Sequence, residues 1–203
     1  MAEAVVTLAP IIVTGARISD LRSNLGSVVR PNNFSVSLSL SLAVRTALGL
    51  SVGASDTEIS TTFPLRCEKA ELPGRTIATS DDTSIGTSLK LPYDMTYNDI
   101  QLSIICASDM KERRFFEAWM RSIVKRNGTI AYYSDYAKGN TLTVSQLDDD
   151  GTSKLTYQCR DIYPIAITPM NATWEENNTY QRFGVTLCYR FYDGISVAST
   201  LRF

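Results

Sequence analysis

Strict alternation of apolar and hydroxyl side chains between Phe34 and Leu42 is the strongest constraint on how this chain can fold. The segment reads FSVSLSLSL, so each apolar residue is followed by a serine until the final leucine. Successive side chains of a β-strand point to opposite faces of a sheet. The segment therefore predicts a strand with one buried face and one polar face.

Three further regions show the same period of two. Residues 99–106 predict a second half-buried strand, and residues 181–192 (QRFGVTLCYRFY) predict one long amphipathic strand. Residues 140–147 and 154–162 flank an Asp-Asp-Asp-Gly sequence, and Asp-Gly is favoured in two-residue hairpin turns. These two runs predict a hairpin. A calcium loop fits the acidic cluster less well, because its carboxylates are adjacent instead of alternating.

Residues 108–128 follow a helical period instead. Ser108 or Asp109 is the expected N-cap, Glu112 is placed to complete a capping box with Asp109, and Asn127-Gly128 is the expected end. The basic residues of this helix predict a solvated face, with a nucleic-acid face as the alternative. The apolar stripe that we expect to face the core consists of Phe116, Trp119, Met120 and Ile123.

The chain length favours one domain, residues 30–203, preceded by an N-terminal arm, residues 1–29. Within the domain, residues 43–62 and 75–98 lose the alternation and are expected to form long loops. The predicted fold class is mainly β, a sandwich or flattened barrel of antiparallel strands with one flanking α-helix.

The composition argues against an enzyme. The sequence contains 0 histidines, which removes Ser-His and Cys-His nucleophilic pairs and histidine-based metal sites. No pair of carboxylates stands out for acid-base chemistry. The cysteines lie far apart without a C-x-x-C pair, so they predict buried thiols instead of a zinc site or a disulfide framework. We therefore expect no catalytic residue, no metal and no cofactor.

The charge balance argues against tight binding of nucleic acid. Lys+Arg 20 against Asp+Glu 21 gives a net charge of -1, so the chain carries no basic field that would hold a polyanion. The N-terminal stretch lacks a basic region before its apolar residues and is interrupted by Pro10, which makes it a poor signal peptide or membrane anchor. Synthesis inside a cell and no membrane anchoring are the corresponding expectations.

Four segments occur in a characteristic order: RPNNFSV, RCEKAELPG, ERRFFEAWMRSI and the stretch from Tyr163 to Tyr192. Their order and spacing resemble those of the tail tube proteins of T-even-type contractile-tail phages, over roughly residues 20 to 193. The matching positions are Arg30, Pro31, Asn32, Phe34, Cys67, Pro73, Phe116, Trp119, Trp174, Asn178, Phe183, Val185, Thr186, Leu187 and Tyr189.

This resemblance implies a β-sandwich whose copies form homohexameric rings, with strands of neighbouring subunits completing a barrel around a lumen. The rings would stack into a tube, with sheath and baseplate proteins as further partners. DNA would pass through the lumen without specific binding. The chain would be a virion component synthesised in the host cytoplasm.

The resemblance also assigns roles to particular residues. Residues 75–98 correspond to a family loop that reaches the adjacent ring, so inter-ring contact is expected at Arg75, Asp81, Asp82, Lys90 and Tyr93. Small hydroxyls offer phosphates little to bind, which makes two polar strand faces candidates to line the lumen. These candidates are Ser35, Ser37, Ser39 and Ser41, or Thr141, Thr143 and Ser145.

Two alternatives remain open at this point. The long 43–62 segment and the extended chain ends also suit a baseplate tube-initiator protein of the same fold, which joins a hub to the tail tube. A β-sandwich carbohydrate-binding module is the second alternative, with Tyr132, Tyr133 and Tyr136 as an aromatic platform.

Overall fold

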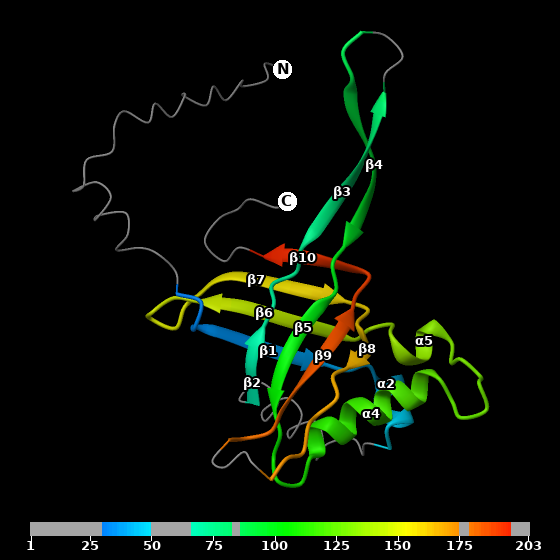
Figure 1. Ribbon diagram of the computed structural model, residues 1–203, viewed down its shortest axis with the longest axis vertical. Helices are drawn as coiled ribbons and strands as arrows, with labels where there is room; N and C mark the ends of the chain where they lie inside the picture. Colours follow the sequence, from blue (N-terminus) through cyan, green and yellow to red (C-terminus); the bar gives the residue numbers. More distant parts are fainter. Residues whose placement is uncertain (1–29, 50–65, 83–85, 175–178, 196–203) are drawn as a thin grey trace, which may run out of the picture.

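The computed structural model describes residues 30–49, 66–82, 86–174 and 179–195, whose arrangement is shown in Figure 1. The expected N-terminal arm, residues 1–29, lies outside the described residues. The described chain forms two four-stranded sheets and a two-stranded hairpin, all antiparallel, with helices grouped at one side. The predicted mainly β fold is confirmed. In place of the one expected helix, the described residues contain a long helix, α4, and two short ones, α2 and α5.

The first sheet has the strand order β1-β6-β7-β10. Its strands are β1 (Phe34–Ser39), β6 (Thr141–Leu147), β7 (Ser153–Arg160) and β10 (Phe191–Ile195). The predicted hairpin is β6–β7, but its turn is longer than two residues. The Gly151 N–H donates to the Asp148 carbonyl at 2.9 Å, and Gly151 has φ 74. A glycine is favoured there because it enters the left-handed region without steric cost.

The second sheet has the order β2-β5-β9-β8. Its strands are β2 (Cys67–Ala70), β5 (Ile100–Ile105), β9 (Arg182–Cys188) and β8 (Tyr163–Ile167). The strand predicted at 99–106 is β5. The single strand predicted at 181–192 is wrong, because the chain turns at Tyr189 and Arg190 and continues as β10 of the first sheet. Tyr189 is also buried, so the alternation of buried and exposed residues continues through this corner. The sequence pattern therefore does not show that one strand ends and another begins here.

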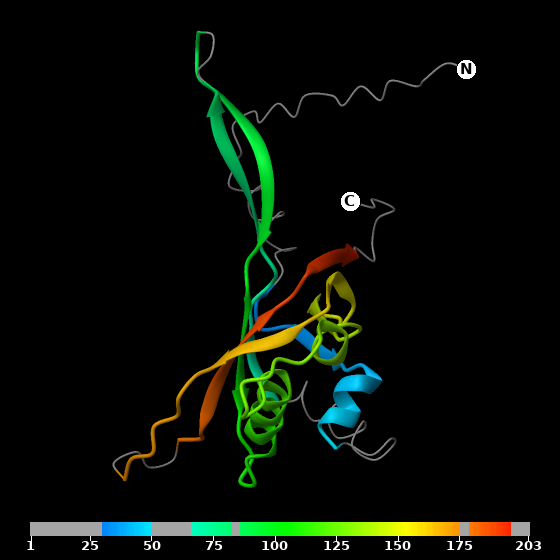
Figure 2. The same cartoon turned by 90° about the vertical axis from the view of Figure 1, so that its right-hand side faces the viewer.

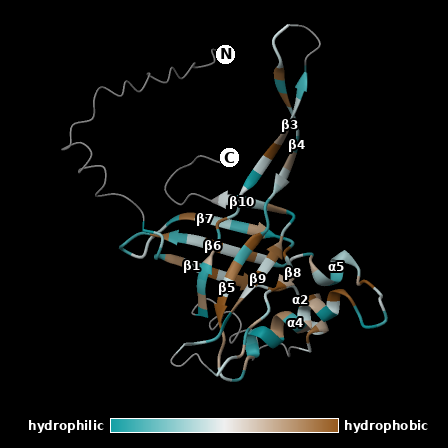
Figure 3. Cartoon of the chain, in the orientation of Figure 1, coloured by the Kyte–Doolittle hydropathy of each residue, from teal (hydrophilic) through white to brown (hydrophobic). Residues whose placement is uncertain are grey.

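The two sheets pack face to face, with their strands crossing at a steep angle (Figure 1). Strands β5 and β9 cross the first sheet, and the hydropathy colouring of Figure 3 shows that both strands are rich in apolar residues. Each fully buried Val, Leu or Ile contributes roughly 1.5–3 kcal/mol. The largest fully buried aliphatic side chains are Val36, Val44, Ile100, Leu102, Ile104, Leu142, Val144, Ile162 and Leu187.

Helix α4 (Lys111–Ile123) lies beside the two sheets with the short helices α2 (Leu42–Ala47) and α5 (Tyr133–Tyr136) (Figure 2). Phe116 and Trp119 are fully buried, and the Phe116 ring meets the Phe183 ring of β9 edge-on at 6.2 Å. The other two residues of the expected stripe, Met120 and Ile123, are half-buried. None of the described helices is long and apolar enough to cross a membrane.

The expected capping box of α4 is wrong. The N-cap is Met110, in a left-handed conformation with φ 53, and it makes no side-chain capping bond. The Glu112 carboxylate instead accepts the Ala107 N–H at 3.1 Å and forms an ion pair with Arg66. Glu112 therefore links the start of α4 to the beginning of β2.

Residues 75–98, expected as a loop, form a hairpin of β3 (Arg75–Asp82) and β4 (Leu89–Tyr97). It continues the β2–β5 pair and projects far beyond the sheets (Figures 1 and 2). The strand period is hard to recognise because β4 contains Pro92 and a bulge at Tyr93, which has no partner in β3. The hairpin leaves most side chains of both strands exposed.

The start of the expected 43–62 loop is also ordered differently. β1 ends at Ser39, and Ser41 is the N-cap of α2, with its hydroxyl accepting the Val44 N–H at 3.5 Å. The Ser41 N–H donates to the side-chain oxygen of Asn140 at 2.8 Å. This bond to a distant residue stops the strand although the serine-leucine alternation continues. Residues 50–62 lie outside the described residues.

Candidate functional site

The outer face of the first sheet collects the hydroxyl residues of β1 and β6. The register of these strands places the odd-numbered residues of β1 opposite odd-numbered residues of β6. Because paired residues share a face, the two sets that the sequence offered as alternatives form one continuous surface. The facing pairs are Ser35 with Ser145, Ser37 with Thr143 and Ser39 with Thr141.

Strands β7 and β10 extend this polar face. Thr156, Gln158 and Arg160 of β7 pair with Ser145, Thr143 and Thr141. On β10, Asp193 lies opposite Gln158, and the apolar Phe191 lies opposite Arg160. The Ser145 and Thr156 hydroxyls lie 3.0 Å apart. The polar face, as we use the term, consists of Ser35, Ser37, Ser39, Thr141, Thr143, Ser145, Thr156, Gln158, Arg160 and Asp193.

The charges of the polar face cancel. Arg160 Nε lies 3.0 Å from Asp193 Oδ2, and both side chains are about half exposed. The sequence analysis missed both residues, together with Thr156 and Gln158. The alternation of residues 153–160 was visible, but only the β6–β7 register shows that these residues share a face with the serines of β1.

One expected lumen residue does not belong to the polar face. Ser41 lies beyond the end of β1, is half-buried, and uses its hydroxyl and N–H in the contacts with Val44 and Asn140. It is therefore a structural residue of the connection between β1 and α2.

The outer edge of β1 leaves backbone groups open. The Leu147 N–H donates to the Asn33 carbonyl at 2.8 Å, which fixes the phase of the hydrogen-bonded pairs between β1 and β6. Because bonded and non-bonded pairs alternate, the backbone groups of Phe34, Val36 and Leu38 point away from β6. Within the described part of the chain, no strand pairs with this edge.

The edges of the second sheet differ from those of the first. β2 has only 4 residues, carries Glu68 and Lys69, and is interrupted by a register shift. β8 contains Pro164 and a second register shift. Short length, charge, proline and bulges all hinder the addition of another strand. β1 carries neither a charged residue nor a proline, so its edge is the one best suited to accept a further strand; β10, at the other edge of the first sheet, carries Asp193.

The expected inter-ring residues all lie on the projecting hairpin. Arg75 is at its base, and Asp81, Asp82 and Lys90 lie near its far end. Tyr93 occupies the bulge, and its side chain is 72% exposed.

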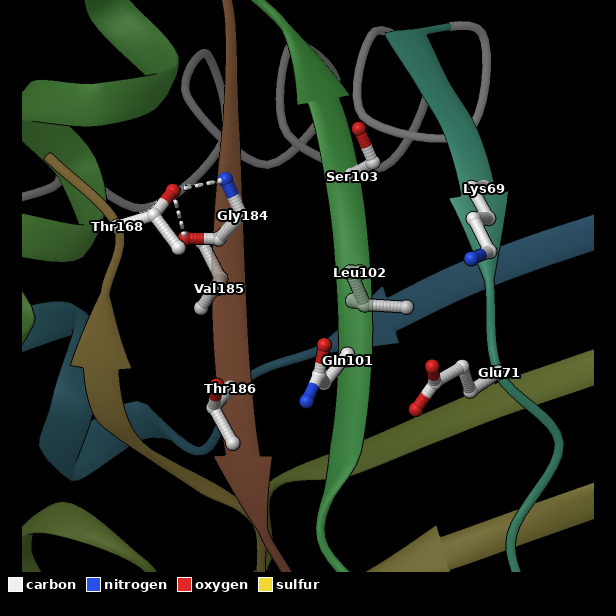
Figure 4. A pocket seen from close by; sticks show the side chains of 9 residues that line it. All are labelled: Lys69, Glu71, Gln101, Leu102, Ser103, Thr168, Gly184, Val185 and Thr186. Carbon is white, nitrogen blue, oxygen red and sulfur yellow. Dashed lines mark hydrogen bonds between the residues drawn. The ribbon is translucent and has the colours of Figure 1, made fainter. Parts of the chain in front are cut away.

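A shallow groove crosses the outer face of the second sheet (Figure 4). It has a volume of about 270 Å³ and is lined mainly by polar residues of β2, β5 and β9. Gly184 is one of its lining residues; the Thr168 hydroxyl accepts the Gly184 N–H at 2.6 Å, and a Cβ on residue 184 would come within 3.1 Å of the Thr168 side chain. The groove contains no nucleophile with an adjacent base, and the described residues contain no group of metal-ligating side chains.

The cysteines are free thiols; Cys67 and Cys159 are buried, as predicted, whereas Cys106 and Cys188 are only half-buried. Burial raises the pKa of Cys67 to about 11 and that of Cys159 to about 12. Both thiols therefore stay protonated near neutral pH, which makes them poor nucleophiles and poor metal ligands.

The tyrosines proposed as a sugar platform do not form one. Tyr133 and Tyr136 meet edge-on at 5.8 Å, and Tyr136 meets Tyr163 in the same way at 5.3 Å. Of the three, only Tyr132 is largely exposed, at 81%. Tyr133 and Tyr136 thus pack edge-on instead of presenting, with Tyr132, a flat stacking surface.

The sequence profile of the family described as phage tail tube protein matches residues 29–194. The chain therefore belongs to the phage tail tube protein family. Membership makes it a structural tube component of a phage tail and not an enzyme. The comparison with curated protein sequences finds no match.

Solved structures of contractile injection systems share the fold. A chain of the extended sheath-tube complex of the extracellular contractile injection system PVC has a TM-score of 0.58 at 14% identity, covering 87% of this chain and 97% of that one. A chain of the PVC sheath/tube terminator has 0.57 at 14% identity, covering 83% and 97%. A chain of the six-fold symmetrised baseplate of the anti-feeding prophage has 0.57 at 12% identity, covering 85% and 98%.

Proposed function

We propose that copies of this chain close their first sheets, edge to edge, into a homohexameric ring of a contractile tail. The observation that carries this proposal is the open backbone edge of β1, which has neither charge nor proline, in a molecule whose second sheet has guarded edges. A tail tube subunit needs one sheet that accepts strands of its neighbours. The first sheet, which contains β1, is also the sheet with the polar outer face.

Strand directions permit such a closure. β1 runs with β7, and β6 runs with β10, because every neighbouring pair in the first sheet is antiparallel. β10 of one copy would thus meet β1 of the next in an antiparallel pair. The contact is heterologous, and a heterologous contact that closes on itself forms a ring. The baseplate assembly that shares the fold is six-fold symmetrised, which supports a ring of six copies.

In this ring the polar face lines the lumen, because the opposite face of the first sheet is covered by the second sheet. Its hydroxyls and the compensated pair Arg160–Asp193 provide no excess positive charge. Phosphates bound by cationic side chains would be held through counterion release, so a neutral lining suits a conduit for DNA ejection. DNA would pass through the tube without specific binding.

Stacked rings would contact one another through the hairpin residues Arg75, Asp81, Asp82, Lys90 and Tyr93. The hairpin supports this role because it extends well past the sheets of its own subunit (Figure 2). The sheath-tube and baseplate assemblies that contain the same fold support sheath and baseplate proteins as further partners.

The substitution Phe34→Pro tests the ring. Phe34 opens β1 and its N–H points outward, so proline would remove an edge donor without removing a bond to β6. Wild-type protein is expected to form rings or tubes in negative-stain electron microscopy, whereas Phe34→Pro stays a folded monomer by circular dichroism and light scattering. Phe34→Ala, which keeps the N–H, is the control and should assemble. Normal rings from Phe34→Pro would contradict the proposal.

A baseplate tube-initiator protein is the second candidate, because the fold matches the baseplate chain and the sheath-tube chain equally well, with TM-scores of 0.57 and 0.58. Copy number separates the two. Quantitative mass spectrometry of purified tails should give many rings of a tube subunit for each baseplate, but only a single ring of an initiator.

A further inference from the structure

Helix α4 is followed by a well-defined turn that has no role in the core. Val124 and Ile130 form a β-bridge, and the Ala131 N–H donates to the Ile123 carbonyl at 2.9 Å. The Lys125 N–H donates to the Thr129 carbonyl at 3.0 Å. Backbone bonds therefore hold the segment in one shape. We call residues 124–132 the α4 turn.

The α4 turn presents apolar side chains to solvent. Val124 is 53%, Ile130 68% and Tyr132 81% exposed. Such a group of exposed apolar side chains, rimmed by polar ones, is typical of an interaction surface.

The rim of the α4 turn is cationic. Lys125 and Arg126 are exposed, and neither forms an ion pair with another described residue. The nearest acidic residue on α4, Glu117, already contacts Arg113 at 2.9 Å and Arg121 at 3.9 Å. The surface therefore suits a partner that is both apolar and acidic.

The far half of the hairpin has this chemistry. The bulge at Tyr93 shifts the β3–β4 register, so that Leu89 lies opposite Asp82 and Leu91 opposite Ser80. Leu89 and Leu91 thus share a face with an acidic residue, and their side chains are 61% and 44% exposed.

The bulge is what creates this face. Apolar residues occupy every odd position of β4 from Leu89 to Tyr97, and without the extra residue all of them would lie on one side. With the bulge, Met95 stays on the side of Ile77, whereas Leu89 and Leu91 turn to the other. The distal face therefore has its own orientation, separate from that of the hairpin base.

The hairpin of a copy cannot reach its own α4 turn. It projects from one end of the long axis, whereas α4 and the segment leading to α5 lie beside the sheets toward the other end (Figures 1 and 2). Two complementary surfaces at separate places on one molecule make a head-to-tail contact, which builds open stacks.

We propose that the distal hairpin face of one copy docks on the α4 turn of a copy in the adjacent ring. Leu89 and Leu91 cover Ile130 and Tyr132, while Asp82, which shares their face, approaches Lys125 and Arg126. This contact rests on the proposed ring function and specifies which surface of the next ring receives the hairpin. Because the two surfaces differ, all subunits of a tube point the same way along its axis.

Charge reversal tests the contact. Lys125→Glu with Arg126→Glu should leave rings intact and shorten tubes, raising the protein concentration needed for stacking about tenfold, a typical effect of a lost interface charge pair. Adding Asp82→Lys should restore part of the stacking, whereas Asp81→Lys, on the opposite face of the hairpin, should not. Arg114→Glu with Lys138→Glu is the matched control, because it makes the same change of charge at exposed residues outside the α4 turn. Tube length is measured by electron microscopy.

A photo-crosslinking amino acid in place of Leu91 gives a second readout that does not depend on stability. Mass spectrometry of crosslinked tubes should identify peptides that contain residues 124–132 of another copy. The proposed contact would be contradicted if the rings stack but the crosslinks fall on other peptides. It would also be contradicted if the charge-reversal variant and the control variant form tubes of equal length. Either result would leave the ring proposal standing. If wild-type protein forms no ring, both the ring proposal and the proposed contact between rings are contradicted.

Discussion

The Tyr189 hydroxyl donates a hydrogen bond to the Gly74 carbonyl at 3.1 Å. Tyr189 lies at the corner between β9 and β10, and Gly74 immediately precedes β3. The Tyr189 ring also meets Tyr97, the last residue of β4, at 5.8 Å, and Tyr192 of β10 at 6.1 Å. The base of the projecting hairpin is thereby attached to the point where the chain crosses between the sheets.

Removing this hydroxyl should loosen the hairpin base. Tyr189→Phe keeps the buried ring but leaves the Gly74 carbonyl without its donor, so we expect a loss of about 1–2 kcal/mol in the free energy of unfolding. Tyr189→Ala also leaves a cavity and should cost about 3–5 kcal/mol. Urea unfolding followed by fluorescence measures both. Tyr132→Phe, at an exposed position, should change nothing measurable, and an equal loss there would contradict the assignment.

Asn140 should be among the most sensitive polar residues of the chain. It is fully buried, and its side chain accepts the Ser41 N–H at 2.8 Å and donates to the Tyr136 and Ile162 carbonyls at 2.8 and 3.1 Å. Asn140→Ala removes the partners of the Ser41 N–H and the Ile162 carbonyl, while the Tyr136 carbonyl keeps the Trp119 indole N–H at 3.2 Å, so the substitution should cost at least about 2 kcal/mol. The matched control is Asn127→Ala, at an exposed position, and thermal unfolding compares the two. Similar melting temperatures of the two variants would contradict the stabilising role assigned to the Asn140 side chain.

Cationic side chains on the polar face should turn the lumen into a DNA-binding surface. Ser37→Arg with Thr143→Arg places two guanidinium groups opposite each other, and in a ring these charges accumulate around the pore. Assembled variant protein should bind short duplex DNA at least about tenfold more tightly than wild type, with affinity that falls steeply as salt increases. Fluorescence anisotropy measures this binding.

The matched control for this DNA experiment adds the same charge to the other sheet. Gln101→Arg with Thr186→Arg places facing arginines on the outer face of the second sheet. Equal DNA binding by the two variants would mean that the polar face does not line the pore.

Stability should fall in alkaline solution. Burial raises the pKa of Cys159 from 9.0 to about 12 and that of Cys67 from 9.0 to about 11. A raised pKa in the folded state means that the unfolded chain loses its proton first, so the stabilising contribution is complete below about pH 9 and disappears as the pH rises toward 12. Urea unfolding between pH 7 and 11 should show this decline, and Cys159→Ala should flatten it. An unchanged slope in that variant would exclude the thiol as a cause.

The strands predicted best are those whose buried face alternates without interruption. β1, β5 and the β6–β7 hairpin follow from their own sequences, because one face of each meets the same core. The errors occur where a distant residue decides the outcome. The side-chain oxygen of Asn140 accepts the Ser41 N–H, and β1 ends there although the serine-leucine alternation continues. The corner at Tyr189 keeps the alternation and hides a change of sheet.

The candidate surface was predictable only in part. The serines of β1 and the hydroxyls of β6 were recognisable as polar strand faces, but their union depends on a pairing between segments more than a hundred residues apart. Sequence spacing does not encode that register. Arg160 and Asp193 become part of the surface for the same reason, through pairings of β7 with β6 and β10.

In the described part of the chain, the first sheet contains an even number of strands, and its two outermost strands run in opposite directions. In the proposed ring, the pairing of β10 with β1 of the next copy is therefore antiparallel, like every pairing within the sheet, whatever the number of copies. The diameter of the proposed pore would then depend on the angle between neighbouring copies, so substitutions along β1 and β10 would change that diameter while every strand keeps its direction.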